Sequence, residues 1–123
     1  MHLVPAERAH HQAIDNHRVC DAIEALGEPE HLTAWAARFS LLGDRSRLAL
    51  LLCIRTAGPI SVTDLALAAG MHATTTSQAL RLLRAAGAVT TAREGRIVRY
   101  QLADEALNVL LAAASPHQDA SSN

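Results

Sequence analysis

The chain has 123 residues, half of them hydrophobic but with one Trp, one Tyr and one Phe, which predicts a single domain with a core of Leu, Ala, Val and Ile. No stretch approaches the ~20 apolar residues of a membrane span, and the start of the chain lacks an export signal. Two cysteines are too few for a disulfide framework. We therefore expect a cytoplasmic protein without a membrane partner. The net charge of −1 conceals a basic centre, because residues 45–99 contain eight Arg and only two acidic residues, while the segments before and after them are acidic. Such a pattern is typical of a phosphate-binding face.

The first 28 residues form a His-rich N-terminal extension that we expect to be partly helical and to end at Gly27. From Pro29 the apolar residues recur at intervals of three and four, which predicts a helix that ends at Gly43. The apolar face of this helix consists of Leu32, Trp35, Phe39 and Leu42.

Asp44 has the side chain of an N-cap for the next helix. We expect the buried side of that helix to contain Leu48, Leu51, Leu52 and Cys53. Residues 57–59 have the composition of a turn, after which Ser61 caps a short helix that runs through Ala69 and stops at Gly70. The inward residues of this short helix are predicted to be Leu65 and Ala68.

A further helix is predicted over residues 73–86, with Ala79, Leu80 and Leu83 inward and Thr75, Gln78 and Arg81 outward. Two strands follow, at 88–93 and 96–102, joined at Glu94-Gly95.

Asp104 then caps a last helix, and residues 115–123 are expected to be a disordered tail. The inward side of the last helix is predicted to contain Leu107, Leu110, Leu111 and Ala114. These elements predict a mainly α-helical protein with a small β-hairpin wing, that is, a winged helix-turn-helix domain at residues 29–114.

A helix-turn-helix braces its first helix against the DNA backbone and places its second helix in the major groove. The short polar side chains at the start of helix 73–86 suit contact with base edges, and the Arg-rich hairpin suits contact with phosphates. We therefore expect the chain to bind double-stranded DNA through Thr74, Thr75, Ser77, Gln78, Arg81, Arg93, Arg96 and Arg99. The alternatives are that these residues only cap the helix and carry solvated charge, or that the winged helix contacts a protein.

The chain resembles the ArsR/SmtB family of transcriptional regulators across residues 29–114. The similar strings are LLGDRSRLALLL, SVTDLALAAGM, TTTSQALRLLRAAGAV and REGRIVRYQL. The family signature Leu-x-Asp-x-x-Arg-Leu is present from Leu42 to Leu48. The recognition helix departs from the family pattern at Ala79, where a His is usual, and at Thr76, which replaces a common Val, so the operator sequence is left open.

The resemblance implies a homodimer in which the first and last helices of the domain pack across the two-fold axis. The apolar stripes on these helices agree, because a small monomer has little with which to cover them. The predicted interface contains Leu32, Trp35, Phe39, Leu107, Leu110 and Leu111. The family mostly represses transcription from inverted-repeat operators and releases DNA when an effector binds.

Both metal sites that the resemblance implies are depleted in this chain. Ser61, Val62 and Thr63 stand where one family site has Cys, and of the second site only Asp104 and His117 remain. The extension is the better metal candidate, because imidazole and thiolate are ligands that nickel, cobalt and zinc accept. A metal ion of this class is therefore expected at His10, His11, His17 and Cys20, with Asp104 or His117 of a partner chain completing the site. The alternative is a mobile His-rich arm.

Two non-metal signals stay open at this point. Some family members sense oxidants through a Cys at the position of Cys53 paired with one in the last helix. The last helix has none here, so Cys20 could take its place only if the N-terminal arm folded back to within ~7 Å of Cys53. A partner protein is a further effector. No Ser/His/Asp or Cys/His set lies on loops beside a Gly-rich element, so we do not expect an enzyme.

Overall fold

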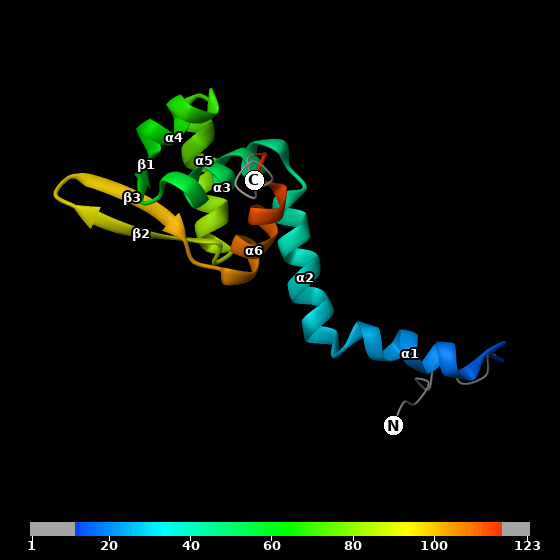
Figure 1. Ribbon diagram of the computed structural model, residues 1–123. Helices are drawn as coiled ribbons and strands as arrows, with labels where there is room; N and C mark the ends of the chain where they lie inside the picture. The colour runs from blue at the N-terminus through cyan, green and yellow to red at the C-terminus, as the bar shows by residue number, and fades with distance from the viewer. Residues whose placement is uncertain (1–11, 117–123) are drawn as a thin grey trace, which may run out of the picture. The chain divides into compact units, whose positions relative to one another are not determined.

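A computed structural model describes residues 12–116 of the chain, which divides into two units, residues 1–39 and residues 40–123. Across the described residues there are six helices and one small antiparallel sheet (Figure 1). Their order is α1 (Asn16–Leu26), α2 (Pro29–Leu42), α3 (Arg45–Ala57), β1 (Ile60–Ser61), α4 (Val62–Ala69), α5 (Ala73–Ala85), β2 (Val89–Glu94), β3 (Ile97–Leu102) and α6 (Glu105–Ala114). This architecture confirms the predicted winged helix-turn-helix.

Three of the predicted N-caps are present, and each satisfies a free amide of the first helical turn. The carboxylate of Asp44 accepts a hydrogen bond from the backbone N of Arg47 at 3.0 Å, and Ser61 Oγ accepts one from the backbone N of Asp64 at 3.2 Å. Asp104 Oδ1 accepts one from the backbone N of Ala106 at 2.9 Å. These bonds fix the starts of α3, α4 and α6.

The corner between α2 and α3 explains the signature Leu-x-Asp-x-x-Arg-Leu. While Asp44 caps α3, the guanidinium of Arg47 donates to the carbonyl oxygens of Leu41 at 3.0 Å and of Ser40 at 2.9 Å. Those carbonyls belong to the last turn of α2, where they have no partner within the helix. One Asp and one Arg thus hold the end of one helix against the start of the next.

The sheet has the strand order β1-β3-β2, and all its pairs are antiparallel. Ile60 lies opposite Tyr100, and Val89 lies opposite Leu102. The hairpin strands begin and end within one residue of the predicted bounds. Strand β1 was not predicted, because its two residues follow a turn and pair only with residues about forty positions further along the chain.

The core of the second unit is formed by side chains from α3 to α6 and from β2. Its buried members are Leu50, Leu51, Ile54, Leu65, Leu80, Leu83, Ala88, Val89, Leu107 and Leu111. Three predicted faces need correction. In α3, Leu50 and Ile54 are buried, whereas the predicted Leu48, Leu52 and Cys53 are only partly buried. In α4, Ala66 is buried in place of Ala68, and in α6 Ala114 is exposed.

The described part of the first unit contains α1 and the start of α2, and neither helix has a fully buried residue. On α2, Leu32 is 52% exposed and Phe39 is 57% exposed. Trp35 lies between them, with its ring centroid 6.0 Å from that of Phe39 and 4.8 Å from the guanidinium carbon of Arg38. Among the residues that the structure describes, no helix is long and apolar enough to cross a membrane.

Candidate nucleic-acid interface

Helices α4 and α5 form the helix-turn-helix, and the turn between them is fixed by backbone contacts. Gly70 adopts the left-handed conformation at φ 66°, and the backbone N of Met71 bonds to the carbonyl of Ala66 at 2.9 Å. At the start of α5, the carbonyl of His72 accepts from both the backbone N and the hydroxyl of Thr76, each at 2.9 Å. Thr76 is fully buried, so its hydroxyl positions the helix and is not available to DNA.

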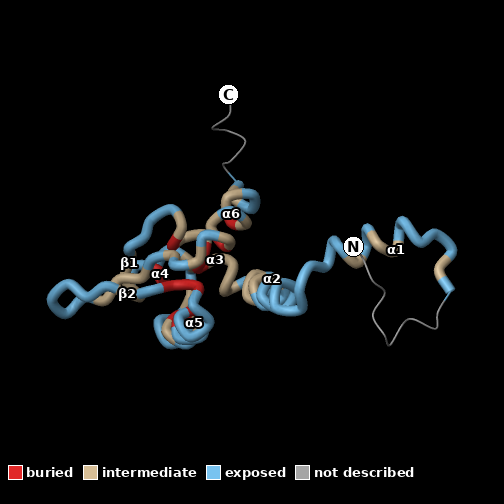
Figure 2. Tube along the Cα trace, turned by 90° about the horizontal axis from the view of Figure 1, so that it is seen from below, coloured by how far each residue is buried: buried red, intermediate tan, exposed pale blue. Residues whose placement is uncertain are grey.

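The other polar side chains at the start of α5 lie toward solvent. Thr74, Thr75, Gln78 and Arg81 are exposed, and Ser77 is half-buried. Figure 2 shows that α5 lies at one edge of the second unit with most of its outer side exposed. Leu80 and Leu83 hold the opposite side of the same helix in the core. All five predicted DNA-binding residues of α5 therefore belong to a helix whose opposite side is packed into the core.

The hairpin does not present its three arginines in the same way. In the sheet register Arg93 lies opposite Val98 and Arg99 lies opposite Ala92, so Arg93 and Arg99 are on opposite faces of the ribbon. Arg99 Nη1 donates to Glu94 Oε1 at 2.6 Å, which pairs its charge. Arg96 lies in the turn itself. The predicted cluster of three available guanidinium groups is thus reduced to Arg93 and Arg96.

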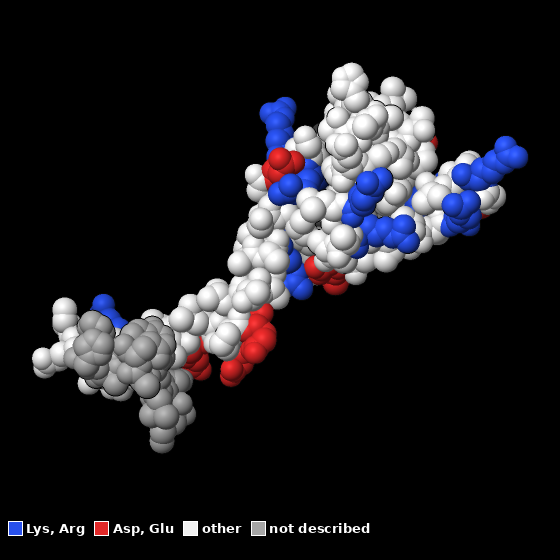
Figure 3. Space-filling view, turned by 180° about the vertical axis from the view of Figure 1, so that it is seen from behind, with Lys and Arg blue, Asp and Glu red and all other residues white. Residues whose placement is uncertain are grey.

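The basic centre can be divided by what each arginine contacts. Arg47 and Arg55 bond to oxygens inside the second unit, and Arg99 is paired with Glu94. The remaining five are exposed and make no side-chain hydrogen bond or ion pair within the described range: Arg45, Arg81, Arg84, Arg93 and Arg96. Figure 3 shows basic side chains spread over one face of the second unit and at the end of its hairpin.

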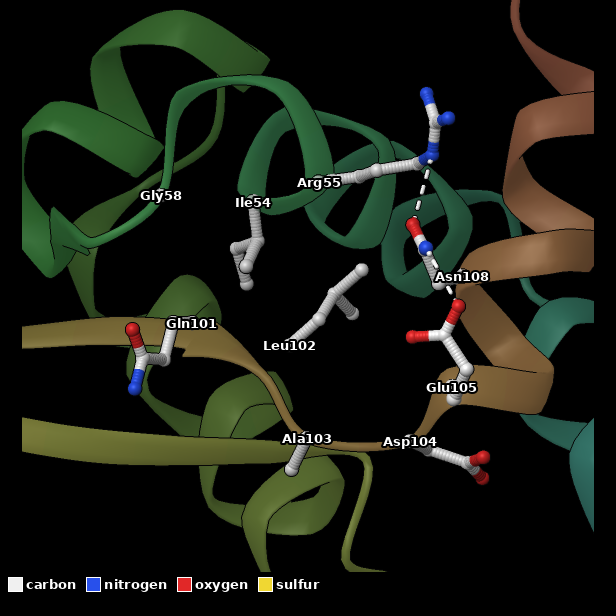
Figure 4. Close-up of a pocket in the computed structure, with 9 residues that line it drawn as sticks. All are labelled: Ile54, Arg55, Gly58, Gln101, Leu102, Ala103, Asp104, Glu105 and Asn108. Atoms are coloured by element: carbon white, nitrogen blue, oxygen red, sulfur yellow. Dashed lines mark hydrogen bonds between the residues drawn. The ribbon is translucent and has the colours of Figure 1, made fainter.

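A polar cavity of about 320 Å³ lies between the end of α3, the end of β3 and the start of α6 (Figure 4). At its edge, Asn108 Oδ1 accepts from Arg55 Nε at 3.0 Å, while Asn108 Nδ2 donates to Glu105 Oε1 at 3.2 Å. This chain of bonds, which the sequence did not predict, ties α6 to α3. The Nε of Arg55 is therefore engaged within the second unit.

Of the six predicted metal ligands, the structure describes His17, Cys20 and Asp104. His10, His11 and His117 lie outside the described residues. On α1, His17 is exposed and Cys20 is partly buried, three positions apart, while Asp104 accepts the cap bond of α6. Within residues 12–116, no three His, Cys, Asp or Glu side chains are close enough to hold a metal ion.

Two of the six residues predicted for a dimer interface need correction. Leu107 and Leu111 have no exposed surface in the single chain, because both pack into its core. On α6 the exposed large hydrophobic residue is instead Val109, at 62%, and Leu110 is partly buried. Leu32, Trp35 and Phe39 on α2 keep surface for a second chain to cover.

Comparison with known proteins gives relatives of one kind. The HTH-type transcriptional regulator NmtR of Mycobacterium tuberculosis is 40% identical over 84 residues, which are 68% of this chain and 69% of the relative. The transcriptional repressor BigR from Xylella fastidiosa is 28% identical with a TM-score of 0.64, over 68% of this chain and 85% of that chain.

A third relative is described as a cadmium metal-sensor. This protein, CMTR from Mycobacterium tuberculosis, is 33% identical with a TM-score of 0.55, over 65% of this chain and 83% of that chain. No family model matches the sequence. The named relatives are transcriptional regulators, a repressor or a metal sensor, and none is an enzyme.

Proposed function

This chain belongs to the ArsR/SmtB family of winged helix-turn-helix transcriptional regulators, and on that premise we propose that it is a cytoplasmic, dimeric repressor that binds an inverted-repeat operator and responds to an effector. The observation that carries the proposal is the exposed polar side of α5 beside a hairpin with two arginines, Arg93 and Arg96, that have no side-chain partner among residues 12–116. A regulator of this kind needs one surface for base edges and another for phosphates.

Helix α5 has the side chains that base recognition requires. Gln78 offers an amide that donates and accepts at once, which suits the edge of adenine, and Arg81 suits guanine or a phosphate. Thr74 and Thr75 are short, so the end of the helix can approach the groove closely. Because the buried hydroxyl of Thr76 donates to the carbonyl of His72, the first turn of α5 is rigid and these side chains are held in position.

The hairpin supplies the phosphate contacts. Arg93 and Arg96 are exposed and have no acidic partner within the described residues, so both guanidinium groups are available to the DNA backbone. Arg99 reaches a phosphate only when it leaves Glu94. The carboxylate of Glu94 therefore neutralises part of the positive charge of the hairpin.

Dimer formation through the apolar face of α2 supports operator binding. In a two-fold dimer, two recognition helices lie about 34 Å apart and fit successive major grooves of an inverted repeat. Leu32, Trp35 and Phe39 offer the exposed apolar surface that such an interface uses.

The experiment that tests DNA binding is a fluorescence anisotropy titration with an inverted-repeat duplex enriched by the full chain from a random-sequence pool. Arg96→Gln should weaken binding about tenfold at ~0.1 M salt and lower the slope of log K against log salt by about one, because one phosphate contact is lost. Glu94→Gln should tighten binding and raise that slope by about one, because Arg99 is released.

Glu105→Gln is the matched control, because it removes one acidic charge on α6 without changing the hairpin, and its slope should equal that of the wild type. Failure to enrich any duplex, or binding that does not depend on salt, would refute DNA binding. Such a result would favour a winged helix used for protein contacts.

We also propose that the effector is a metal ion of the nickel, cobalt or zinc class. Support comes from the cadmium metal-sensor among the relatives and from His17 and Cys20 on one side of α1. Because the described residues hold no complete site, such a metal requires ligands from outside them, such as His10, His11 or His117, or from a second chain.

Titration of the DNA complex with nickel, cobalt and zinc salts should lower DNA affinity about tenfold with at least one of them, within the usual range of allosteric coupling. The double substitution His17→Ala and Cys20→Ser should remove that response, whereas His31→Ala on α2 should keep it. If none of the three metals changes DNA affinity, the signal is a partner protein or a thiol oxidant instead.

A further inference from the structure

Helix α5 has four distinct sides, which follow from 100° of rotation per residue. Thr76, Leu80 and Leu83 face the core, and Thr74 and Gln78 lie on the outward side. The two flanks between these sides differ in chemistry. One flank carries Ser77, Arg81 and Arg84, and the other carries Thr75, Ala79 and Leu82.

The basic flank is continuous, because its members are four and three positions apart and are neighbours on the helix surface. Arg81 and Arg84 are exposed and unpaired within the described part of the chain. On a helix that lies in the major groove, this flank fits against the wall of the groove where the phosphates run. That placement fixes how the helix is rotated about its own axis.

With the basic flank at the wall of the groove, the outward side and the apolar flank next to it are turned toward the base edges. Leu82 is 49% exposed, and Thr75, which carries a methyl group, is also exposed about two helical turns nearer the start of the helix. Ala79 between them is small and partly buried, so the strip is not interrupted by a polar group. The only apolar group that a base presents in the major groove is the C5-methyl of thymine.

From this arrangement, and resting on the DNA binding proposed above, we propose that Thr75 and Leu82 contact thymine methyl groups and so determine operator sequence. Burial of a methyl group against an apolar side chain favours thymine over cytosine at the contacted positions. Arg81 and Arg84 add affinity without this preference. Specificity at these positions therefore comes from an apolar contact and not from a hydrogen bond.

The test replaces each thymine of the enriched inverted-repeat duplex in turn by deoxyuridine, which removes only the C5-methyl group. With the wild-type chain, at least one thymine in each half-site should show a loss of affinity of about fourfold. In Leu82→Ala the same replacement should have no further effect, because the partner of the methyl group is gone. Thr75→Ser keeps its hydroxyl and should abolish the deoxyuridine effect at a second thymine.

Arg84→Gln is the matched control on the basic flank. It should weaken binding to every duplex and lower the salt slope by about one, while the fourfold deoxyuridine effect stays. The inference is overturned if no deoxyuridine weakens wild-type binding, if the effects persist in both Leu82→Ala and Thr75→Ser, or if Leu82→Ala dissociates the dimer in sedimentation. These outcomes differ from failure of the proposed function, in which the wild-type chain enriches no duplex.

Discussion

Replacing Leu32 and Phe39 together by aspartate should convert the proposed dimer into monomers and lower affinity for the inverted-repeat duplex by about a hundredfold or more. Both side chains are more than half exposed on α2, which has no fully buried residue. In a two-fold interface each substitution is present twice, so four carboxylates would enter an apolar contact. Burying unpaired charge there opposes association strongly.

The loss of DNA affinity follows from the loss of the dimer. A dimer binds its second half-site as an intramolecular step, whereas a monomer has only one recognition helix and one hairpin. Sedimentation equilibrium measures the oligomeric state, and anisotropy measures the affinity. Both measurements should change together.

A substitution on the far side of the same helix provides the control. Ala37 is exposed and lies roughly opposite Leu32 and Phe39 around the helix axis, so Ala37→Asp adds the same charge and should leave the dimer intact. A dimer that survives the double substitution, or one that Ala37→Asp also dissociates, would show that this face of α2 is not the interface.

The features that the sequence predicted well depend on residues close together in the chain. Asp44, Ser61 and Asp104 each cap a helix by bonding to an amide two or three residues ahead. Such contacts need no tertiary information, because the local spacing and the residue type are sufficient. The recognition helix was predicted for the same reason, since its apolar and polar residues alternate with a clear helical period.

The features that the sequence missed depend on packing or on pairing between distant segments. Residues 48–54 of α3 are all apolar, so no polar residue marks which side of the helix faces the core. Strand β1 exists only because β3 pairs with it. Arg93 and Arg99 were expected to act together, but the register of the hairpin places them on opposite faces and brings Glu94 to Arg99.

The assignment of Leu107 to the core, and not to a dimer interface, leads to the second large expected effect. Leu107→Ala should lower the free energy of unfolding by about 2–5 kcal/mol, because a fully buried side chain is lost and a cavity remains. Urea unfolding followed by circular dichroism measures the change. For a domain of this size, such a loss is a large part of the total stability.

Val109→Ala is the matched control, because it shortens a side chain on the same helix that is 62% exposed, and its effect should stay below about 1 kcal/mol. The dissociation constant of the folded dimer should be the same in Leu107→Ala as in the wild type, since this side chain has no surface to offer a second chain. If Leu107→Ala instead left the unfolding free energy of each chain unchanged and weakened the dimer, Leu107 would belong to the interface. The side of α6 that faces the core would then be assigned wrongly, and so would the packing of α6 against α3.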